Sequence, residues 1–375
     1  MSKLQELIKE LCPDGVEFKK LGEVCKIMNG KDYKHLNNGI YPVYGSGGIM
    51  NYVDNFVYDK PSVLLPRKGS IGNVFYVDSP FWTVDTIYWT RINTNFIIPK
   101  FLYYYIKTQN LEGKNTAIGA VPSLTQSVLN KIEIPLPPLE VQSEIVRILD
   151  TFTAHTAELQ AELQARKEQY EYYRNKLLTF DENDERVKWI KLGEIGNTCM
   201  CKRIMKHQTS DIGEVPFFKI GTFGKEADAF ISYELYDEYK NKYSFPRKGE
   251  ILISASGTIG RTVIYDGQDA YFQDSNIIWI QNDESKVLNK YLYYYYQIIE
   301  WNVEGGTIKR LYNTNLSKTI IAYPPLSEQK RIISILDKFE SLVNDLSEGL
   351  PAEIAAVQEQ YEYYRNKLLT FKRKS

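Results

Sequence analysis

Residues 168–180 read EQYEYYRNKLLTF, and residues 359–371 repeat the same thirteen letters without a mismatch. The two copies are 191 residues apart, about half of the 375-residue chain. A looser match precedes each copy, because PPL at 137–139 corresponds to PPL at 324–326 with an offset of 187. The second copy therefore contains four additional residues. A repeat on this scale indicates that the chain arose by internal duplication.

Each repeated segment closes a stretch with helical periodicity, residues 139–182 and residues 326–371. Apolar side chains recur there at steps of three and four residues, which is typical of a coiled-coil seam. The prolines at the start of each stretch bar a helix upstream, and a long amphipathic helix needs a partner to bury its apolar face. We therefore predict two long antiparallel helices that pack together. Gly349 and Pro351, beside the four additional residues, favour a break in the second helix.

Two globular bodies, residues 16–138 and 187–325, precede these helices and correspond to each other in order rather than in detail. For example, GSIG at 69–72 recurs as GTIG at 257–260. Short runs of strand composition, bounded by Gly, Pro, Asn and Asp, indicate that both bodies are β-rich with a few helices. The predicted fold class is α+β, with two mixed globular domains joined by the two coiled-coil helices in a pseudo-two-fold internal repeat.

The two ends of the chain complete this domain plan. Residues 1–15 have the pattern of a short amphipathic helix, and residues 372–375 form a basic tail. The chain contains no uncharged apolar run of roughly 18 residues, so we expect no membrane association. Four sparse cysteines argue against a disulfide framework. Together these features predict a cytoplasmic protein with reduced cysteines.

The formal net charge of −1 is unusual for a nucleic-acid binder, because Lys and Arg normally supply most of the affinity for phosphates. The charge is divided by segment, however. Residues 16–138 carry about +4 and residues 187–325 about +1, whereas residues 139–186 carry about −5 and residues 326–371 about −3. Acidic helices can simply be solvated, or they can face a basic partner.

The motifs of several enzyme classes are missing. We find no glycine-rich loop for S-adenosylmethionine, and YPPL at 323–326 lacks the amide and the terminal aromatic residue of a base-holding tetrad. No phosphate loop for ATP is present. Cys199, Cys201 and His207 form only a weak zinc pattern. We therefore expect no catalytic residue, no metal and no cofactor in this chain.

Basic and small polar residues beside the glycine turns are the candidates for DNA contacts, since Arg and Lys pair with phosphates and guanine edges and tight turns expose backbone N–H groups. Each could equally be an ordinary surface or turn residue. The candidates are Lys31, Lys34, Ser46, Arg67, Lys68, Ser70, Lys202, Arg203, Lys206, Ser256, Thr258, Arg261, Lys309 and Arg310.

Tyrosines of the repeated segment are candidates for a partner interface, because buried aromatic side chains often anchor interfaces. At helical spacing they could instead pack the two helices together. The candidates are Tyr170, Tyr173, Tyr361 and Tyr364.

The order of these parts, with a Pro-Pro-Leu start and a QYEYYRNKLLTF end to each helix, resembles the specificity subunits of type I restriction-modification systems. The resemblance covers essentially the whole chain. It implies that residues 16–138 and 187–325 are target-recognition domains, each reading one half of a split site in double-stranded DNA. It also implies that the helices fix the gap between the halves and dock two modification subunits, which restriction subunits then join. The family transfers no catalytic residue to this chain.

Three other classes remain open on the sequence. A purely structural coiled-coil scaffold explains the helices but not the two divergent globular domains. A specificity factor of a methylation-only or phage-exclusion system would have the same sequence features. A standalone enzyme is disfavoured by the missing motifs.

Overall fold

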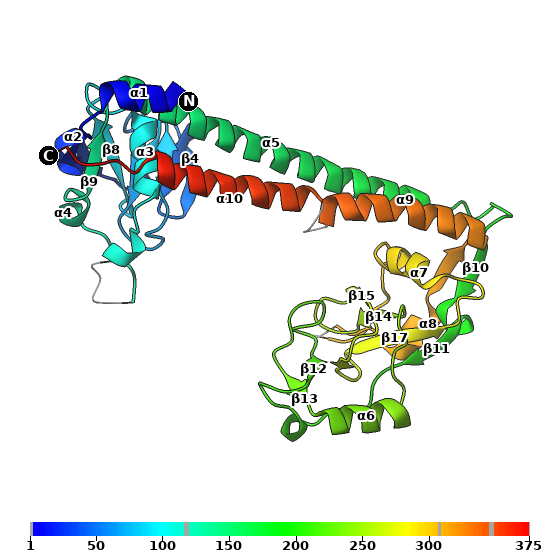
Figure 1. Cartoon of the computed structure of the whole chain (residues 1–375). Helices are drawn as coiled ribbons and strands as arrows, with labels where there is room; N and C mark the ends of the chain where they lie inside the picture. Colours follow the sequence, from blue (N-terminus) through cyan, green and yellow to red (C-terminus); the bar gives the residue numbers. More distant parts are fainter. Residues whose placement is uncertain (1–2, 116–119, 307–308, 345–348, 375) are drawn as a thin grey trace. The chain divides into compact units, whose positions relative to one another are not determined.

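The computed structural model describes residues 3–115, 120–306, 309–344 and 349–374 (Figure 1). It divides into two units. The first unit comprises Met1–Gln160 and Glu353–Ser375, and the second comprises Ala161–Ala352. Each unit contains one globular head and one stretch of paired helices. Among the described residues, no helix is both long and apolar enough to cross a membrane.

The first head contains three small sheets. A four-stranded antiparallel sheet has the order β2-β8-β5-β6, a three-stranded sheet has the order β4-β3-β7, and β1 pairs with β9. The strands are β1 (Glu17–Lys20), β2 (Cys25–Asn29), β3 (Asn38–Gly45), β4 (Gly48–Val53), β5 (Ser62–Pro66), β6 (Phe75–Val77), β7 (Trp82–Thr83), β8 (Ile87–Ile92) and β9 (Glu133–Leu136). The helices are α1 (Lys3–Leu11), α2 (Leu21–Val24), α3 (Pro99–Lys107), η1 (Glu112–Lys114) and α4 (Gln126–Leu129).

The second head repeats this topology with a different sequence. Its sheets have the orders β11-β17-β14-β15, β13-β12-β16 and β10-β18. The strands are β10 (Lys188–Lys191), β11 (Gly196–Cys199), β12 (Val215–Phe218), β13 (Phe230–Ile231), β14 (Ile251–Ser254), β15 (Thr262–Ile264), β16 (Tyr271–Phe272), β17 (Ile277–Asn282) and β18 (Ile320–Tyr323). The helices are η2 (Leu192–Glu194), η3 (Lys206–Gln208), α6 (Tyr233–Lys242), α7 (Asn289–Tyr296) and α8 (Asn313–Lys318).

The central strands β5 and β14 explain why both heads hold together. All five residues of β5 and all four of β14 are buried, because a different apolar cluster covers each face of these strands. A strand buried on both sides has a continuous apolar sequence rather than an alternating one, as VLL at 63–65 and ILI at 251–253 show. The two mixed heads confirm the predicted α+β class.

Three helices form the paired stretches: α5 (Leu139–Leu178), α9 (Leu326–Asn344) and α10 (Leu350–Leu368). In the first unit, Phe152 of α5 stacks on Tyr364 of α10, with ring centroids 5.6 Å apart. In the second unit, Tyr173 of α5 stacks on Phe339 of α9 at 5.5 Å. From Phe152 to Tyr173 along α5, the stacked partner changes from Tyr364 to Phe339. The residue numbers run in opposite directions, so the paired helices are antiparallel. The second predicted long helix is thus described as α9 and α10, and residues 345–348 between them lie outside the described residues.

A buried glutamine near the start of each long helix connects the helix to its head. The side chain of Gln142 accepts a hydrogen bond from the Ile98 N–H and donates to the carbonyls of Phe96 and Pro137, at 2.8–2.9 Å. Gln329 makes the same three bonds in the second unit, to Leu288, Lys286 and Pro324. Every polar atom of both amide groups therefore has a partner, so burial of the groups is not penalised.

An ion pair with a tyrosine adds a second connection in each unit. Asp150 of α5 lies 2.8 Å from Lys100 and 2.6 Å from the Tyr104 hydroxyl. Asp337 of α9 is bonded in the same way by Lys290 and Tyr294. Each head is therefore attached to its own helix stretch by the same polar contacts.

The basic tail is part of the first unit. The Val16 N–H donates to the Lys372 carbonyl at 2.8 Å, and the Lys374 N–H donates to the Val16 carbonyl at 2.9 Å. The Arg373 guanidinium lies 2.6 Å from Glu133 and over the ring of Phe18. Both ends of the described chain consequently complete one globular head.

Candidate nucleic-acid interface

The glycine turns that follow β5 and β14 have the same backbone conformation. Gly69 and Gly257 have φ values of +83° and +64°, which L side chains rarely adopt. In each turn the N–H two residues later, of Ile71 or Ile259, donates back to the glycine carbonyl at 2.8–3.0 Å. The recurring GSIG and GTIG motifs therefore correspond to one structural element in both heads.

The same backbone hydrogen bonds hold both turns in place. The Arg67 N–H donates to the Thr86 carbonyl at 3.0 Å, and the Arg67 carbonyl accepts from the Leu124 N–H at 2.9 Å. Ala255 makes the equivalent bonds to Asn276 and Leu311, at 2.7 and 2.9 Å. The next residue then forms an isolated β-bridge, Lys68 with Ser123 in the first head and Ser256 with Arg310 in the second. The scaffold is thus common to both heads, while the side chains on it differ.

In the first head, the structure brings Ser46 close to the turn after β5. A Cβ atom on Gly69 would lie 3.2 Å from the Ser46 hydroxyl. Asn73 also donates to the Ser46 carbonyl at 2.9 Å. Beside them, the Arg67 guanidinium donates to the Asp85 carbonyl at 3.0 Å and lies over the Tyr88 ring. Ser70 is exposed within the turn.

The lysine candidates of the first head are exposed on loops. Lys68 lies next to the turn, whereas Lys31 and Lys34 belong to the loop between β2 and β3. That loop is anchored by the Lys31 N–H, which donates to the Thr83 carbonyl at 2.7 Å. The structure therefore groups Ser46, Arg67, Lys68 and Ser70, and does not bring Lys34 into contact with them.

In the second head, Arg310 is held by the segment that precedes β17. Its guanidinium donates to the Ser275 carbonyl at 2.8 Å, to the Ser275 hydroxyl at 3.1 Å and to the Asn276 side-chain oxygen at 2.7 Å. The Ser256 hydroxyl reaches the same Asn276 oxygen at 2.9 Å. Ser275 has a φ of +53°, a conformation that is uncommon outside glycine. Arg310 and Ser256 are therefore brought together, although they are distant in sequence.

A groove of about 540 Å³ opens beside Arg310. It contains residues that the sequence did not single out, namely Met200, Ser275, Glu304, Leu311, Tyr312, Asn313 and Thr314. The polar triplet Asp274-Ser275-Asn276, directly before a buried strand, is the only sequence signal that could have pointed to part of this set.

The remaining candidates of the second head are spread around it. Arg203 pairs with Asp274 at 2.8 Å, and Arg261 donates to the Phe223 carbonyl at 2.8 Å. The Lys202 ammonium lies over the ring of Tyr243. Thr258, Lys206 and Lys309 are exposed, and no contact joins Lys206 to the Arg310 groove within the described part of the chain.

Arginines and lysines differ in how they are held. Each candidate arginine donates to a protein oxygen, so its guanidinium is already oriented. Lys31, Lys34, Lys68, Lys206 and Lys309 are exposed and form no ion pair with any described residue. An oriented guanidinium is suited to directional bonds with base edges, whereas a mobile ammonium acts as a point charge for phosphates.

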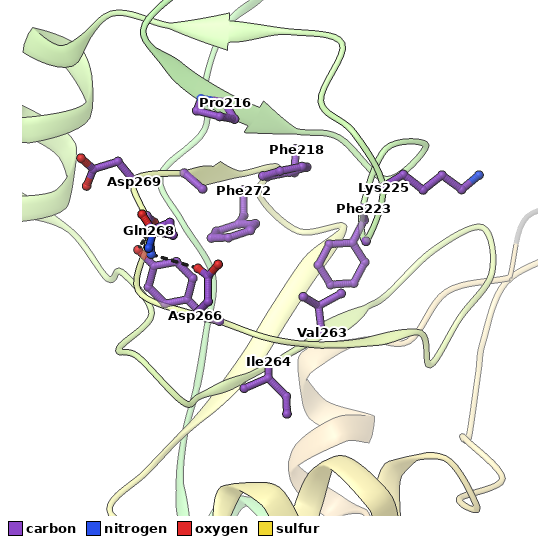
Figure 2. A pocket seen from close by; sticks show the side chains of 13 residues that line it. Pro216, Phe218, Phe223, Lys225, Val263, Ile264, Asp266, Gln268, Asp269 and Phe272 are labelled. Carbon is purple, nitrogen blue, oxygen red and sulfur yellow. Dashed lines mark hydrogen bonds between the residues drawn. The ribbon is translucent and has the colours of Figure 1, made fainter. Parts of the chain in front are cut away.

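An apolar pocket of about 280 Å³ lies elsewhere in the second head (Figure 2). The rings of Phe218 and Phe272 stack on one wall with centroids 5.8 Å apart, and Phe223 and Val263 lie near them. None of the candidate residues contributes to this lining. We therefore do not count the pocket as part of the interface.

The repeated tyrosines fall into three groups by exposure. Tyr170 and Tyr361 are buried, at 6% and 8% exposure, and burial raises the pKa of Tyr170 to about 12. Tyr173 and Tyr364 are 37% and 41% exposed and form the aromatic stacks of the paired helices. The sequence did not single out the most exposed tyrosine of each repeat.

Tyr172 and Tyr363 are that third group, each 60% exposed. Lys176 lies over the ring of Tyr172 at 5.7 Å, and Lys367 lies over that of Tyr363 at 5.4 Å. The two repeats therefore present the same exposed tyrosine and lysine.

Two heads of one topology, attached in the same way to antiparallel helices and carrying different polar side chains on a common turn, define an internally duplicated two-head class of protein. The family described as "Type I restriction modification DNA specificity domain" matches the chain twice, over residues 13–169 and 184–356. The chain belongs to this family of type I restriction-modification specificity subunits.

Full-length relatives support this assignment. A Haemophilus influenzae protein assigned as a type I restriction enzyme specificity subunit is 50% identical, over 95% of this chain and 96% of the relative. The specificity subunit of the Escherichia coli type I restriction enzyme EcoR124I/EcoR124II is 30% identical, over 99% and 98%.

Solved structures show the same fold. The S subunit of a type I restriction-modification system from M. genitalium matches with a TM-score of 0.59 and 16% identity, over 95% of this chain and 96% of that one. A chain from a study of complex assembly in a type I R-M system matches with a TM-score of 0.60 and 19% identity, over 95% and 98%.

Proposed function

We propose that this chain is the DNA-reading, non-catalytic subunit of a cytoplasmic type I restriction-modification complex. Each head binds one half of a bipartite site in double-stranded DNA. The paired helices dock two modification subunits, which bring the methyl-transfer chemistry, and set the gap between the two half-sites. Restriction subunits join through the assembled complex.

The observation that carries this proposal is the common turn with different side chains. Both turns use the same glycine conformation and the same backbone hydrogen bonds. The first head presents Arg67 and Lys68 there, where the second presents Ala255, Ser256 and Arg310. A constant scaffold with variable polar side chains is what two readers of unlike base sequences need, because base edges differ only in their donors, acceptors and methyl groups.

Residue roles follow from how the side chains are held. We assign Arg67 and Arg310 to base edges, since their hydrogen bonds leave other guanidinium N–H groups available in a fixed orientation. The exposed lysines, of which Lys68 directly precedes the first turn, would contact phosphates. These contacts position a protein on DNA without reading its sequence.

The docking role is supported by the exposed surface of the two repeats. Burial explains why both repeats have tyrosine at positions 170 and 361. Stacking on a phenylalanine explains why both have tyrosine at positions 173 and 364. Neither packing argument applies to Tyr172 and Tyr363. Identical exposed residues on two otherwise divergent units fit two copies of one partner.

The gap-setting role is supported by α5, a 40-residue helix whose residues belong to both units. Its length of about 60 Å, at 1.5 Å per residue, is comparable to that of a short stretch of DNA helix. A half-site separation that depends on helix length would need no base contacts in the gap.

Head exchange tests the proposal. Residues 16–138 are replaced by the corresponding domain of a relative with a different sequence, and methylated adenines are mapped in cells that carry the chimaeric complex. We expect one half of the methylated motif to change while the other half and the gap stay the same. An unchanged motif, or a change in both halves, would overturn the proposal.

A further inference from the structure

The first turn of α9 is exposed where the equivalent turn of α5 is covered. With the offset of 187, Val141 corresponds to Glu328 and Glu144 to Arg331. Val141 is fully buried and the Glu144 side chain is only 5% exposed. The Glu328 and Arg331 side chains are 36% and 54% exposed. The two units therefore differ at the same place on the same helix.

Helix α1 accounts for the burial in the first unit. The Lys3 ammonium lies 3.3 Å from Glu144, and Leu4 is 4% exposed within the same apolar cluster as Val141 and Leu369. Leu7 and Ile8 pack against this cluster too, so α1 uses an apolar face with steps of three and four residues. The described segment that precedes the head of the second unit, residues 179–187, forms turns without a helix and so offers no counterpart to α1.

The uncovered surface is a groove of about 380 Å³. We call it the α9 groove; its lining is Lys176, Leu177, Thr179, Phe180, Asp184, Arg186, Val187, Pro324, Pro325, Glu328 and Arg331. Leu177 and Phe180 line this groove with Pro324 and Pro325. Their equivalents Leu368 and Phe371 pack against the apolar cluster that contains Leu4 of α1.

We propose that the α9 groove receives an amphipathic helix of a partner protein, which packs there as α1 packs in the first unit. The incoming helix presents aliphatic side chains with the spacing of Leu4, Leu7 and Ile8. It carries a carboxylate where α1 carries Lys3.

The charges of the groove select this partner. Lys176, Arg186 and Arg331 outnumber Asp184 and Glu328, so one cation is in excess. Both carboxylates are ionised near neutral pH, since Arg186 lowers the pKa of Asp184 to about 2 and Arg331 lowers that of Glu328. A second copy of this chain would bring its own Lys3 toward Arg331, so like charges disfavour self-association through the groove. The inference uses only the second unit and is independent of DNA reading.

Peptide binding to the full chain tests the proposal. The probe is a fluorescent peptide of residues 2–11 with Lys3→Glu, compared with the unaltered sequence by anisotropy. We expect saturable binding of the Lys3→Glu peptide, about fivefold tighter than that of the native peptide, as one ion pair in place of one like-charge contact would produce. In the first unit this peptide would meet Glu144 and compete with the attached α1, so it should bind only to the second unit.

Three chain variants make the test specific. Thr179→Trp fills the groove from an exposed position and should abolish binding, while Thr370→Trp, at the equivalent exposed position of the first unit, should not. Glu328→Val with Arg331→Glu copies the α1-binding surface and should reverse the preference toward the native peptide.

Several results would overturn the proposal. One is that the Lys3→Glu peptide shows no saturable binding, and another is that Thr179→Trp does not reduce its binding. A third is that the variant with Arg331→Glu still prefers the Lys3→Glu peptide over the native one. A dimer of the native chain that Thr179→Trp dissociates in sedimentation would identify a second copy as the occupant, and would overturn it as well.

Discussion

Gln142 and Gln329 occupy the same position in the two units, and both are fully buried. Each forms three hydrogen bonds to backbone groups of the loop ahead of α3 or α7 and of the Pro-Pro turn. In both units the buried amide is therefore the hydrogen-bond partner of one backbone N–H and two backbone carbonyls. A single side chain thereby sets how each head is attached to its helix.

Replacement of Gln329 by leucine should destabilise the second unit by about 2–4 kcal/mol, because it removes three hydrogen bonds of a fully buried side chain and leaves the Pro324 carbonyl, whose bond is buried, without this partner. Chemical denaturation of the variant measures this loss. Gln360→Leu, on an exposed helix surface, is the control and should change stability by less than about 0.5 kcal/mol. Equal effects of the two substitutions would contradict the role given to Gln329.

Glu144 makes the stability of the first unit depend on pH. Hydrogen bonds from Arg147 and Lys3 lower its pKa to about 2, below the value of about 4.3 for an unfolded chain. The folded state therefore favours the charged form, and this stabilisation is present above pH 4.3 and is lost as the pH falls toward 2. The difference in stability between the native chain and Glu144→Gln should shrink over that range. A difference that stays constant from pH 6 to pH 2.5 would be inconsistent with this.

The two kinds of basic residue should behave differently on DNA. Lys68→Ala should weaken binding to all DNA sequences alike and reduce the slope of log affinity against log salt by about 1. Arg310→Lys should instead lower affinity for the recognised site by about 1–3 kcal/mol, with little effect on unrelated DNA. Salt titrations of the assembled complex with both kinds of DNA measure these effects. A uniform loss for Arg310→Lys would exclude it from base reading.

At the scale of elements, α5 pairs with α10 in the first unit and with α9 in the second through equivalent aromatic stacks. The Phe152·Tyr364 and Tyr173·Phe339 pairs have interplanar angles of 26° and 23°. The exposed Tyr172 and Tyr363 lie next to these stacks in the sequence, and each makes an edge contact with the stacked ring beside it. We therefore propose that packing and partner binding use different tyrosines of one repeat.

Assembly with the modification subunit should separate these roles. Tyr172→Ala with Tyr363→Ala should weaken co-purification of that subunit without lowering the melting temperature, because both side chains are largely exposed. Tyr170→Ala should lower the melting temperature by several degrees, since it removes a buried ring. Unimpaired assembly of the double variant would remove these tyrosines from the docking surface.

The helices and the duplication could be predicted from the sequence because both are periodic signals. The break was expected from Gly349 and Pro351 rather than from periodicity, and residues 345–348 beside them lie outside the described residues. The sheet topology could not, since β7, β13 and β16 have only two residues each and pair with strands distant in sequence. The covering of α5 by α1 was also not predictable, because a short amphipathic helix does not reveal which surface it packs on.

The candidate site was predictable only in part. The glycine turns were found because positive φ values require glycine there. The acceptors that orient the arginines were missed, because the Asp85 carbonyl and Ser275 are 18 and 35 residues from Arg67 and Arg310. The sequence also did not show which tyrosines of the repeat are buried and which are exposed. A helical repeat gives the spacing of side chains but not which neighbour covers them.

At the scale of the whole molecule, the four additional residues of the second repeat should influence the DNA gap. Deletion of residues 345–348 gives both repeats the same length, and we expect an altered gap in the methylated motif or a loss of methylation. Mapping of methylated adenines distinguishes these outcomes from a native motif. Full activity with the native gap would argue that helix length does not set the separation.

The pairing of Val16 with Lys372 and Lys374 has a consequence for synthesis on the ribosome. The second unit is one continuous segment and can fold as soon as it emerges, whereas the first unit waits for residues 353–375, which are translated after the entire second unit. Domains normally mature in the order of their translation, and here that order is reversed. The head that is made first remains incomplete longest, and chaperones would have most opportunity to bind it.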